Sequence, residues 1–194
     1  MTVSTNTSVK NFLFNQKEFL IGLLPKNVTD ENARNWILER FDEFVIKKII
    51  KSEEFIIDAG VQLLKNTKTI MVYSFSGVLM KMLLEAHKAG HKFKVIIVDN
   101  PSTHYARDLV SILTSKGIEV IYTLINGVAY FIKDVDKIFV GAYTMFSNGT
   151  LMATTGTSII ASCAHQLKIP FYAVCQTYKF SEKNPIDSFN CNQG

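Results

Sequence analysis

Short, almost wholly apolar runs between Thr69 and Cys175 constrain the fold of this chain more than any other feature of its sequence. The run Val95–Val98 has no polar residue at alternate positions, a pattern typical of a strand covered by helices on both faces. Runs of this kind predict strands at Thr69–Tyr73, Lys94–Val98, Glu119–Thr123, Lys137–Gly141 and Phe171–Cys175. Stretches of helical periodicity between them predict helices at Val78–Ala89, Ser102–Lys116, Asn126–Lys133 and Thr157–Lys168.

The alternation of strands and helices with short connections predicts the fold class. Such a chain forms an α/β fold, here a Rossmann-like, doubly wound and mostly parallel sheet. Gly90 and Gly117 each follow a predicted helix, where a left-handed residue commonly closes the last turn. Ligands of these sheets bind beyond the carboxyl ends of the strands. We therefore expect any pocket to lie among the loops Tyr73–Gly77, Asp99–Thr103, Gly141–Thr144 and Gln176–Lys179.

The first third of the chain carries helical signals instead. Apolar residues recur at helical spacing within Phe12–Leu24, and the acidic pair Asp30-Glu31 suits the first turn of a second helix. A further amphipathic pattern runs through Ala33–Leu64. We therefore divide the chain into an N-terminal helical region, residues 1–68, and a Rossmann-like domain, residues 69–194, on which the helices form a layer.

Composition and charge exclude several classes of protein. Hydrophobic residues make up 47% of the chain, and the net charge of +4 is not gathered into a basic cluster, so we expect no direct nucleic-acid binding. No apolar run reaches the ~20 residues of a membrane span, and the N-terminus lacks the apolar core of a signal peptide. The cysteines, Cys163, Cys175 and Cys191, lack metal-binding spacing. We expect a soluble cytoplasmic protein with reduced thiols and no metal or cofactor.

Several local motifs together resemble one family. Val140-Gly141-Ala142 ends a predicted strand, Asn148-Gly149 forms a turn, Gly156-Thr157 starts a helix, and Ile169-Pro170-Phe171 starts a strand. In this order they resemble the domain shared by regulatory subunits of eukaryotic translation initiation factor 2B and methylthioribose-1-phosphate isomerases. The segment Gln176–Phe180, with the sequence QTYKF, looks most like the delta subunit. Relative to that family, the chain is expected to be truncated at the C-terminus.

The positions of the isomerase catalytic residues separate enzyme from non-enzyme. The resemblance implies a cysteine where this chain has Ser74 and an aspartate where it has Tyr143. Aldose–ketose isomerisation needs a group that takes and returns a proton, and a tyrosine with a pKa near ~10 replaces a carboxylate poorly. We therefore expect no catalytic residue. The alternative is a sugar-phosphate isomerase, for which Ser74 with Asp99 is the one candidate acid/base pair near the strand ends.

A vestigial pocket is still expected at the strand ends. Its predicted residues are Ser74, Gly77, Asp99, Tyr143, Gly156, Thr157 and Lys179. A plainer interpretation exists for several of them. Ser74–Gly77 can be a simple turn in which Ser76 caps the next helix, and Lys179 can be an ordinary exposed loop residue. Gly156-Thr157 can hold an anion at a helix N-terminus or serve packing alone.

The resemblance implies a binding function. It predicts a non-catalytic regulatory subunit of the guanine-nucleotide exchange factor for translation initiation factor 2, which assembles the complex and engages the substrate factor. The expected partners are the other subunits, a beta-like subunit above all, contacted through the α/β region. A sugar-phosphate-binding protein of the same superfamily remains the other alternative.

Overall fold

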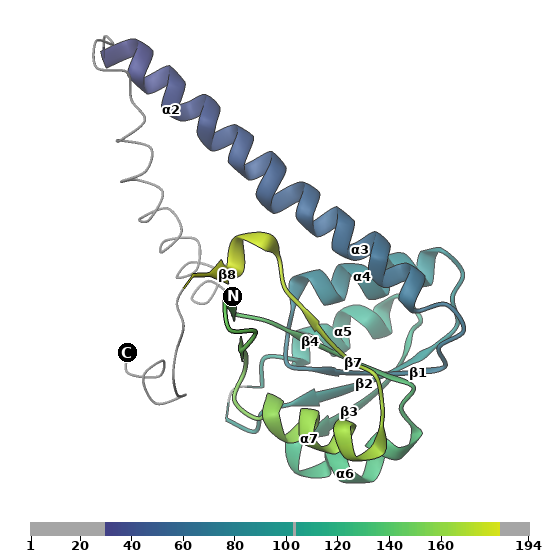
Figure 1. Ribbon diagram of the computed structural model, residues 1–194. Coiled ribbons are helices and arrows are strands. Elements are labelled where there is room, and N and C mark those ends of the chain that lie inside the picture. The colour runs from purple at the N-terminus through teal and green to yellow at the C-terminus, as the bar shows by residue number, and fades with distance from the viewer. Residues whose placement is uncertain (1–29, 103, 183–194) are drawn as a thin grey trace.

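A five-stranded parallel sheet forms the centre of the molecule (Figure 1). The computed structural model describes residues 30–102 and 104–182. The sheet order is β3-β2-β1-β4-β7, and each neighbouring pair is parallel. Its strands are β1 (Thr69–Tyr73), β2 (Lys94–Asp99), β3 (Glu119–Leu124), β4 (Lys137–Gly141) and β7 (Phe171–Val174). This sheet confirms the predicted α/β class, and each predicted strand is present to within one residue at either end.

Helices cover both faces of the sheet, as the unbroken apolar runs predict. One face carries α4 (Gly77–Lys88) and α5 (Arg107–Ser115), and the other carries α6 (Val128–Phe131) and α7 (Thr157–Leu167). Alternate residues of β1 point to opposite layers. Val72 packs in the cluster that includes Leu83 of α4, whereas Met71 packs in the cluster that includes Ile160 of α7. All five residues of β1 are buried, so this strand lies at the centre of the core.

The helices before β1 form one long rod. α2 (Asp30–Phe44) and α3 (Lys51–Leu63) are joined by η1 (Val45–Ile50), a π-helical segment, without a break. At 1.5 Å per residue the rod is about 50 Å long. Its α3 end packs against α4, and its α2 end projects from the body (Figure 1). α2 is described from Asp30 onward, so the predicted helix start at the acidic pair Asp30-Glu31 stays a prediction.

Two predictions about the N-terminal third are not tested by this architecture. The helical pattern at Phe12–Leu24 lies outside the described residues. The division of the chain at residue 68 into two regions stays a prediction.

Two predicted helices differ in detail. α5 begins at Arg107 instead of Ser102, because the Asp99 carboxylate accepts a hydrogen bond from the Ala106 N–H at 3.0 Å and holds the preceding loop in a non-helical path. The predicted helix Asn126–Lys133 is a four-residue α6 between two 3₁₀ turns, η2 (Ile125–Gly127) and η3 (Ile132–Asp134). The two predicted helix ends at Gly90 and Gly117 are confirmed by φ angles of +86° and +80°.

A second, smaller sheet was not predicted. It has the order β6-β5-β8 and consists of β5 (Thr144–Phe146), β6 (Leu151–Met152) and β8 (Phe180–Ser181). The predicted Asn148-Gly149 turn joins β5 to β6, and Gly149 has a φ of +80°. β8 follows β7 through the 3₁₀ turn η4 (Thr177–Lys179) and runs parallel to β5. The chain after β7 is thereby tied back to the loop that follows β4.

Candidate functional site

Tyr73, the last residue of β1, fills the space where the strands of the central sheet end. Its side chain is only 2% exposed, and its hydroxyl donates a hydrogen bond to the Thr155 carbonyl, directly before α7. Gly156 follows with a φ of +102°, and a Cβ atom there would lie 2.5 Å from the Tyr73 hydroxyl oxygen. A side chain of the protein itself thus occupies the space against the segment that leads into α7, beside the helix N-terminus where an anion would bind.

The hydroxyl of Tyr73 stays protonated at neutral pH. Burial raises its pKa, and the nearby Asp99 carboxylate and Tyr143 add to this effect, while a hydrogen bond with the Asn100 side chain acts in the opposite direction. A protonated phenol is a hydrogen-bond donor, which matches its contact with the Thr155 carbonyl. These interactions place Asp99, Asn100 and Tyr143 around the same ring.

Asp99 serves the local structure. It is fully buried at the end of β2, and its carboxylate accepts hydrogen bonds from the Asn100 N–H at 2.8 Å and the Ala106 N–H at 3.0 Å. The Tyr122 hydroxyl donates a third at 3.1 Å, and this hydroxyl also lies 3.3 Å from Nδ1 of His104. A carboxylate with these partners anchors the loop between β2 and α5, and a buried charge needs such partners to be stable.

Ser74 and Ser76 belong to a tight strand-to-helix turn. Ser74 is buried with a φ of +60°, an uncommon conformation for a residue with a Cβ atom, and its N–H donates to the Val98 carbonyl at 2.9 Å. Ser76 occupies the position before α4, but its side chain makes no capping hydrogen bond, so the predicted cap is wrong. The exposed Gly77 starts α4, and a Cβ atom at Gly141 would lie 3.1 Å from the Cβ of Ser76. The loops after β1 and β4 therefore touch.

The start of α7 is held by contacts within its own loop. The Thr157 hydroxyl donates to the Thr154 carbonyl at 2.6 Å, and the hydroxyls of Tyr143 and Thr154 lie 3.1 Å apart. The Tyr143 N–H donates to the Met152 carbonyl at 2.8 Å. Tyr143, at the position of the isomerase aspartate, is thus paired with the segment that leads into α7.

Lys179 is more enclosed than a typical loop lysine. Its Nζ donates to the Ala142 carbonyl at 2.9 Å, next to Tyr143, and the side chain is half-buried. Burial lowers the pKa of this amine, and the Cys175 thiol partly offsets that effect. The plain interpretation of Lys179 as an exposed residue is therefore wrong, because its amine connects η4 to the loop after β4.

The predicted site residues thus lie at one end of the sheet in two groups. Asp99, Tyr143 and Gly156 surround Tyr73, with Ser74 and Thr157 next to them in the chain. Gly77 and Lys179 lie at the edge of this group: Gly77 follows Ser76, which approaches Gly141, and Lys179 bonds to Ala142. Their role as a ligand pocket stays a prediction. Sequence reasoning placed Tyr73 and Asn100 in loops where a pocket was expected but named neither as a site residue, because no sequence signal distinguishes them within those loops.

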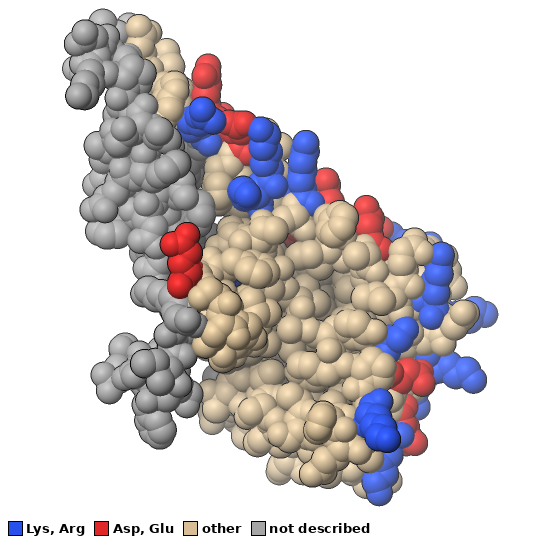
Figure 2. Space-filling view, viewed as in Figure 1, with Lys and Arg blue, Asp and Glu red and all other residues tan. Residues whose placement is uncertain are grey.

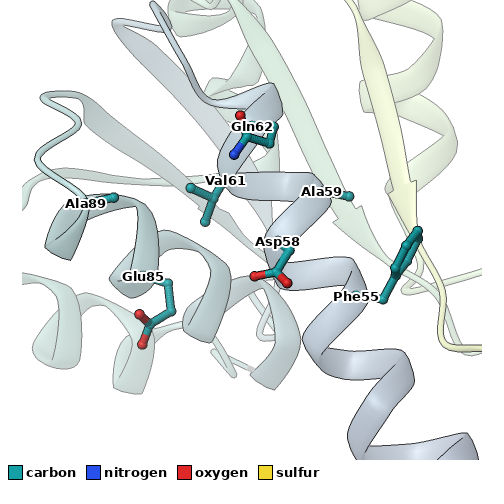
Figure 3. A pocket seen from close by; sticks show the side chains of 7 residues that line it. All are labelled: Phe55, Asp58, Ala59, Val61, Gln62, Glu85 and Ala89. Carbon is teal, nitrogen blue, oxygen red and sulfur yellow. The ribbon is translucent and has the colours of Figure 1, made fainter.

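A separate groove lies between α3 and α4 (Figure 3). It is shallow, has a volume of about 570 Å³, and is lined by Phe55, Asp58, Ala59, Val61, Gln62, Glu85 and Ala89. Two acidic residues, Asp58 of α3 and Glu85 of α4, lie along it. Within residues 30–102 and 104–182, no group of His, Cys, Asp and Glu is arranged to hold a metal ion. No helix of that same part is long and apolar enough to cross a membrane.

The family model described as the initiation factor 2 subunit family matches residues 2–193. The chain belongs to this family. Among its relatives, the delta subunit of translation initiation factor eIF2B from Dictyostelium discoideum is 35% identical over 170 residues, covering 88% of this chain and 27% of the relative. The delta subunit from Schizosaccharomyces pombe is 32% identical, covering 89% and 37%. The chain therefore spans only a quarter to two fifths of these relatives.

The family also contains enzymes. Ribose 1,5-bisphosphate isomerase from Archaeoglobus fulgidus is 32% identical over 180 residues, covering 86% of this chain and 58% of the relative. Among solved structures, the tetrameric eIF2B-beta2-delta2 complex from C. thermophilum superposes with a TM-score of 0.89 at 24% identity, covering 94% of this chain and 59% of the other. At 24% identity, this superposition confirms the fold of the chain. The resemblance noted in the motifs, with delta as the most similar subunit, is confirmed by the family match and the two delta relatives.

Proposed function

We propose that this chain acts as a non-catalytic, delta-like regulatory subunit of the guanine-nucleotide exchange factor for translation initiation factor 2. The observation that carries the proposal is the closure of the strand-end site by Tyr73, in a chain whose relatives include eIF2B delta subunits. Its partners would be the other subunits, a beta-like subunit first, and initiation factor 2 itself. We propose a cytoplasmic location, and neither nucleic acid nor a membrane as a direct partner.

The side chains at the site support binding over catalysis. Isomerisation needs an acid and a base within reach of the substrate. The Asp99 carboxylate is fully buried with three donors around it, and the Lys179 amine is bonded to a backbone carbonyl. Ser74 stands where the isomerase pattern has its cysteine. A substrate bound against Thr155 and Gly156 would have to displace the Tyr73 hydroxyl.

The second candidate function is isomerisation or binding of a sugar phosphate. The archaeal isomerase relative favours it, as does the helix N-terminus that Gly156 opens. This function requires Tyr73 to leave the Thr155 carbonyl and make room for a phosphate beside the N-terminus of α7.

One pair of measurements tests both candidates. Co-expression with a beta-like subunit should yield a complex that survives gel filtration, whereas a coupled assay with pentose phosphates should give no turnover. Turnover that disappears in the Ser74→Ala variant would overturn the regulatory proposal. The same assay on Tyr73→Ala asks whether opening the site restores a latent activity, and we expect none.

A further inference from the structure

The positive charge of the chain gathers at the end of the central sheet where the strands begin. Five segments lead into the five strands: 63–69, 87–94, 115–119, 133–137 and 167–170. They contain nine lysines and three acidic residues, a net charge of +6 with histidine neutral. Since the whole chain carries +4, all its other residues together carry −2. The sequence shows no basic cluster because the lysines are spread over short segments, and the parallel sheet brings them to one edge.

The register of the strands sets these lysines side by side. Lys94 of β2 is the register partner of Thr69 of β1, and its N–H donates to the Lys68 carbonyl at 2.9 Å. Lys137 begins β4 opposite Ile70 of β1. Neighbouring strands lie about 4.8 Å apart, so the basic segments extend over roughly 20 Å across five strands. Figure 2 shows Lys and Arg side chains along the right-hand rim, the side from which the strands of Figure 1 start.

Most of these lysines have no partner of opposite charge. In the part of the chain that the structure describes, six are exposed and have no carboxylate within ion-pair distance. The other three are Lys88, which pairs with Glu85 at 2.6 Å, Lys137, whose amine donates to the Leu63 carbonyl, and the half-buried Lys94. We call the six the lysine rim: Lys65, Lys68, Lys92, Lys116, Lys133 and Lys168.

Helix ends explain only part of the lysine rim. The helix before each strand ends at this edge, and the helix dipole favours a cation there. Lys116 and Lys168 are the C-cap residues of α5 and α7, and Lys133 lies in the last turn of η3. Lys68 and Lys92 lie beyond the last turns of α3 and α4. These two lysines add to the repulsion between like charges without a local partner, which indicates an anion on another molecule.

We propose that the lysine rim binds an acidic segment of another protein, in which Asp and Glu residues are interspersed with apolar ones. Two exposed leucines favour a polypeptide: Leu63 is 39% exposed at the end of α3, and Leu167 is 46% exposed at the end of α7. Carboxylates of such a segment pair with the lysines while its apolar side chains cover the leucines. The rim lies at the opposite end of the sheet from the candidate site, so the inference does not depend on the proposed function.

Nucleic acid fits the lysine rim less well. The five segments contain no arginine, and their only Phe, Tyr or Trp is the half-buried Phe93. Forked guanidinium contacts to phosphate and stacking on bases are therefore both missing. Glu119 and Asp134 are exposed among the lysines and would repel a continuous phosphate backbone. A polypeptide can place neutral residues against them.

Peptide binding to the full chain tests the inference. The probe is a fluorescently labelled, Glu-rich peptide with interspersed Leu, and the control probe has Gln in place of each Glu. Fluorescence anisotropy should show saturable binding of the Glu peptide and none of the Gln peptide. The affinity should fall as salt is added, because salt screens exposed charges.

A matched pair of double variants locates the binding surface. Lys68→Gln/Lys92→Gln removes the two rim lysines that helix ends do not explain, and we expect about fivefold weaker binding or more. Lys48→Gln/Lys51→Gln is the control, since it removes the same charge from exposed positions on the rod, and it should change the affinity less than about twofold. Thermal unfolding checks that the variants fold, and the single variant Lys92→Gln should show a smaller loss in the same direction.

Several outcomes would overturn the inference. If the parent chain does not bind the Glu peptide, the rim has no such partner. If both double variants lose affinity equally, net charge alone attracts the peptide. If single-stranded RNA or vesicles of anionic lipid bind more tightly than the peptide and depend on Lys68 and Lys92, the occupant is not an acidic protein segment. None of these results bears on the co-expression test, so the two proposals fail separately.

Discussion

The packing of Tyr73 against the loop before α7 can be tested by adding one methyl group at Gly156. Gly156→Ala adds a Cβ atom 2.5 Å from the Tyr73 hydroxyl oxygen and 3.2 Å from its Cζ. Tyr73 cannot easily move away, because it is buried and bonded to the Thr155 carbonyl. Overpacking of this kind costs about 1–3 kcal/mol. The φ of +102° adds about 1–2 kcal/mol of backbone strain, so we expect a total loss of about 2–5 kcal/mol in the free energy of unfolding.

Two further variants isolate the steric part. Gly149→Ala is the matched control, since Gly149 has a φ of +80° with nothing within 4 Å of the added atom, and we expect a loss of only about 1–2 kcal/mol. In a Tyr73→Phe background the closest obstacle to the added methyl group, the phenol oxygen, is removed. The cost of Gly156→Ala should therefore fall toward that of the control, a coupling of about 1–3 kcal/mol. Urea unfolding of the four proteins of the cycle measures this coupling. Additive losses, or a Gly156→Ala variant no less stable than Gly149→Ala, would refute the closure of the site by Tyr73.

Three other outcomes are expected. The Asp136 carboxylate accepts hydrogen bonds from the backbone N–H groups of Thr69 and Lys68, and these bonds, that from Thr69 most of all, lower its pKa. The stability that Asp136 adds is therefore present above the unfolded pKa of about 3.9 and is lost as the pH falls through the lower, folded pKa. Asp136→Asn should thus destabilise the chain at pH 7 but converge with the parent in acid; a constant difference in urea midpoints would contradict this. Calorimetric titration with guanine nucleotide or NAD should show no saturable binding, because the sequence lacks the glycine-rich phosphate loops of both ligand classes. Asp99→Asn should lower the free energy of unfolding by about 1–3 kcal/mol, since a neutral amide accepts the buried donors less well, and an unchanged urea midpoint would argue against the anchoring role.

The sequence was sufficient for the central sheet because each strand is a local signal. The run Val95–Val98 is apolar on both faces, and only burial between two helical layers accommodates such a strand. The smaller sheet escaped prediction because β6 and β8 have two residues each, too few to form any periodic pattern. The late start of α5 depends on a bond from Asp99 to a residue seven positions later. The spacing of apolar residues carries no information about such a contact.

The candidate site also depends on contacts between distant residues that no sequence pattern shows. Ser74 and Tyr143 could be identified because they stand at motif positions. Tyr73 could not, because an aromatic residue in an apolar strand is indistinguishable from ordinary core. Its decisive partner, the Thr155 carbonyl, lies 82 positions away in the chain. The enclosure of Lys179 likewise depends on η4 folding back against Ala142, a contact between segments with no common pattern.

The π-helical segment η1 sets the direction in which the outer half of the rod points its side chains. An α-helix turns by about 100° per residue, and a π turn holds an extra residue without advancing by that angle. Removing one residue from Val45–Ile50 would let the segment revert to an α-helix and leave the side chains of α2 pointing almost as they do now, because the deleted residue added little net rotation. The same deletion inside α2 would instead turn the residues before it by about 100° relative to α3. η1 thus marks the one segment of the rod in which a residue can be lost while whatever α2 contacts keeps its orientation to the sheet.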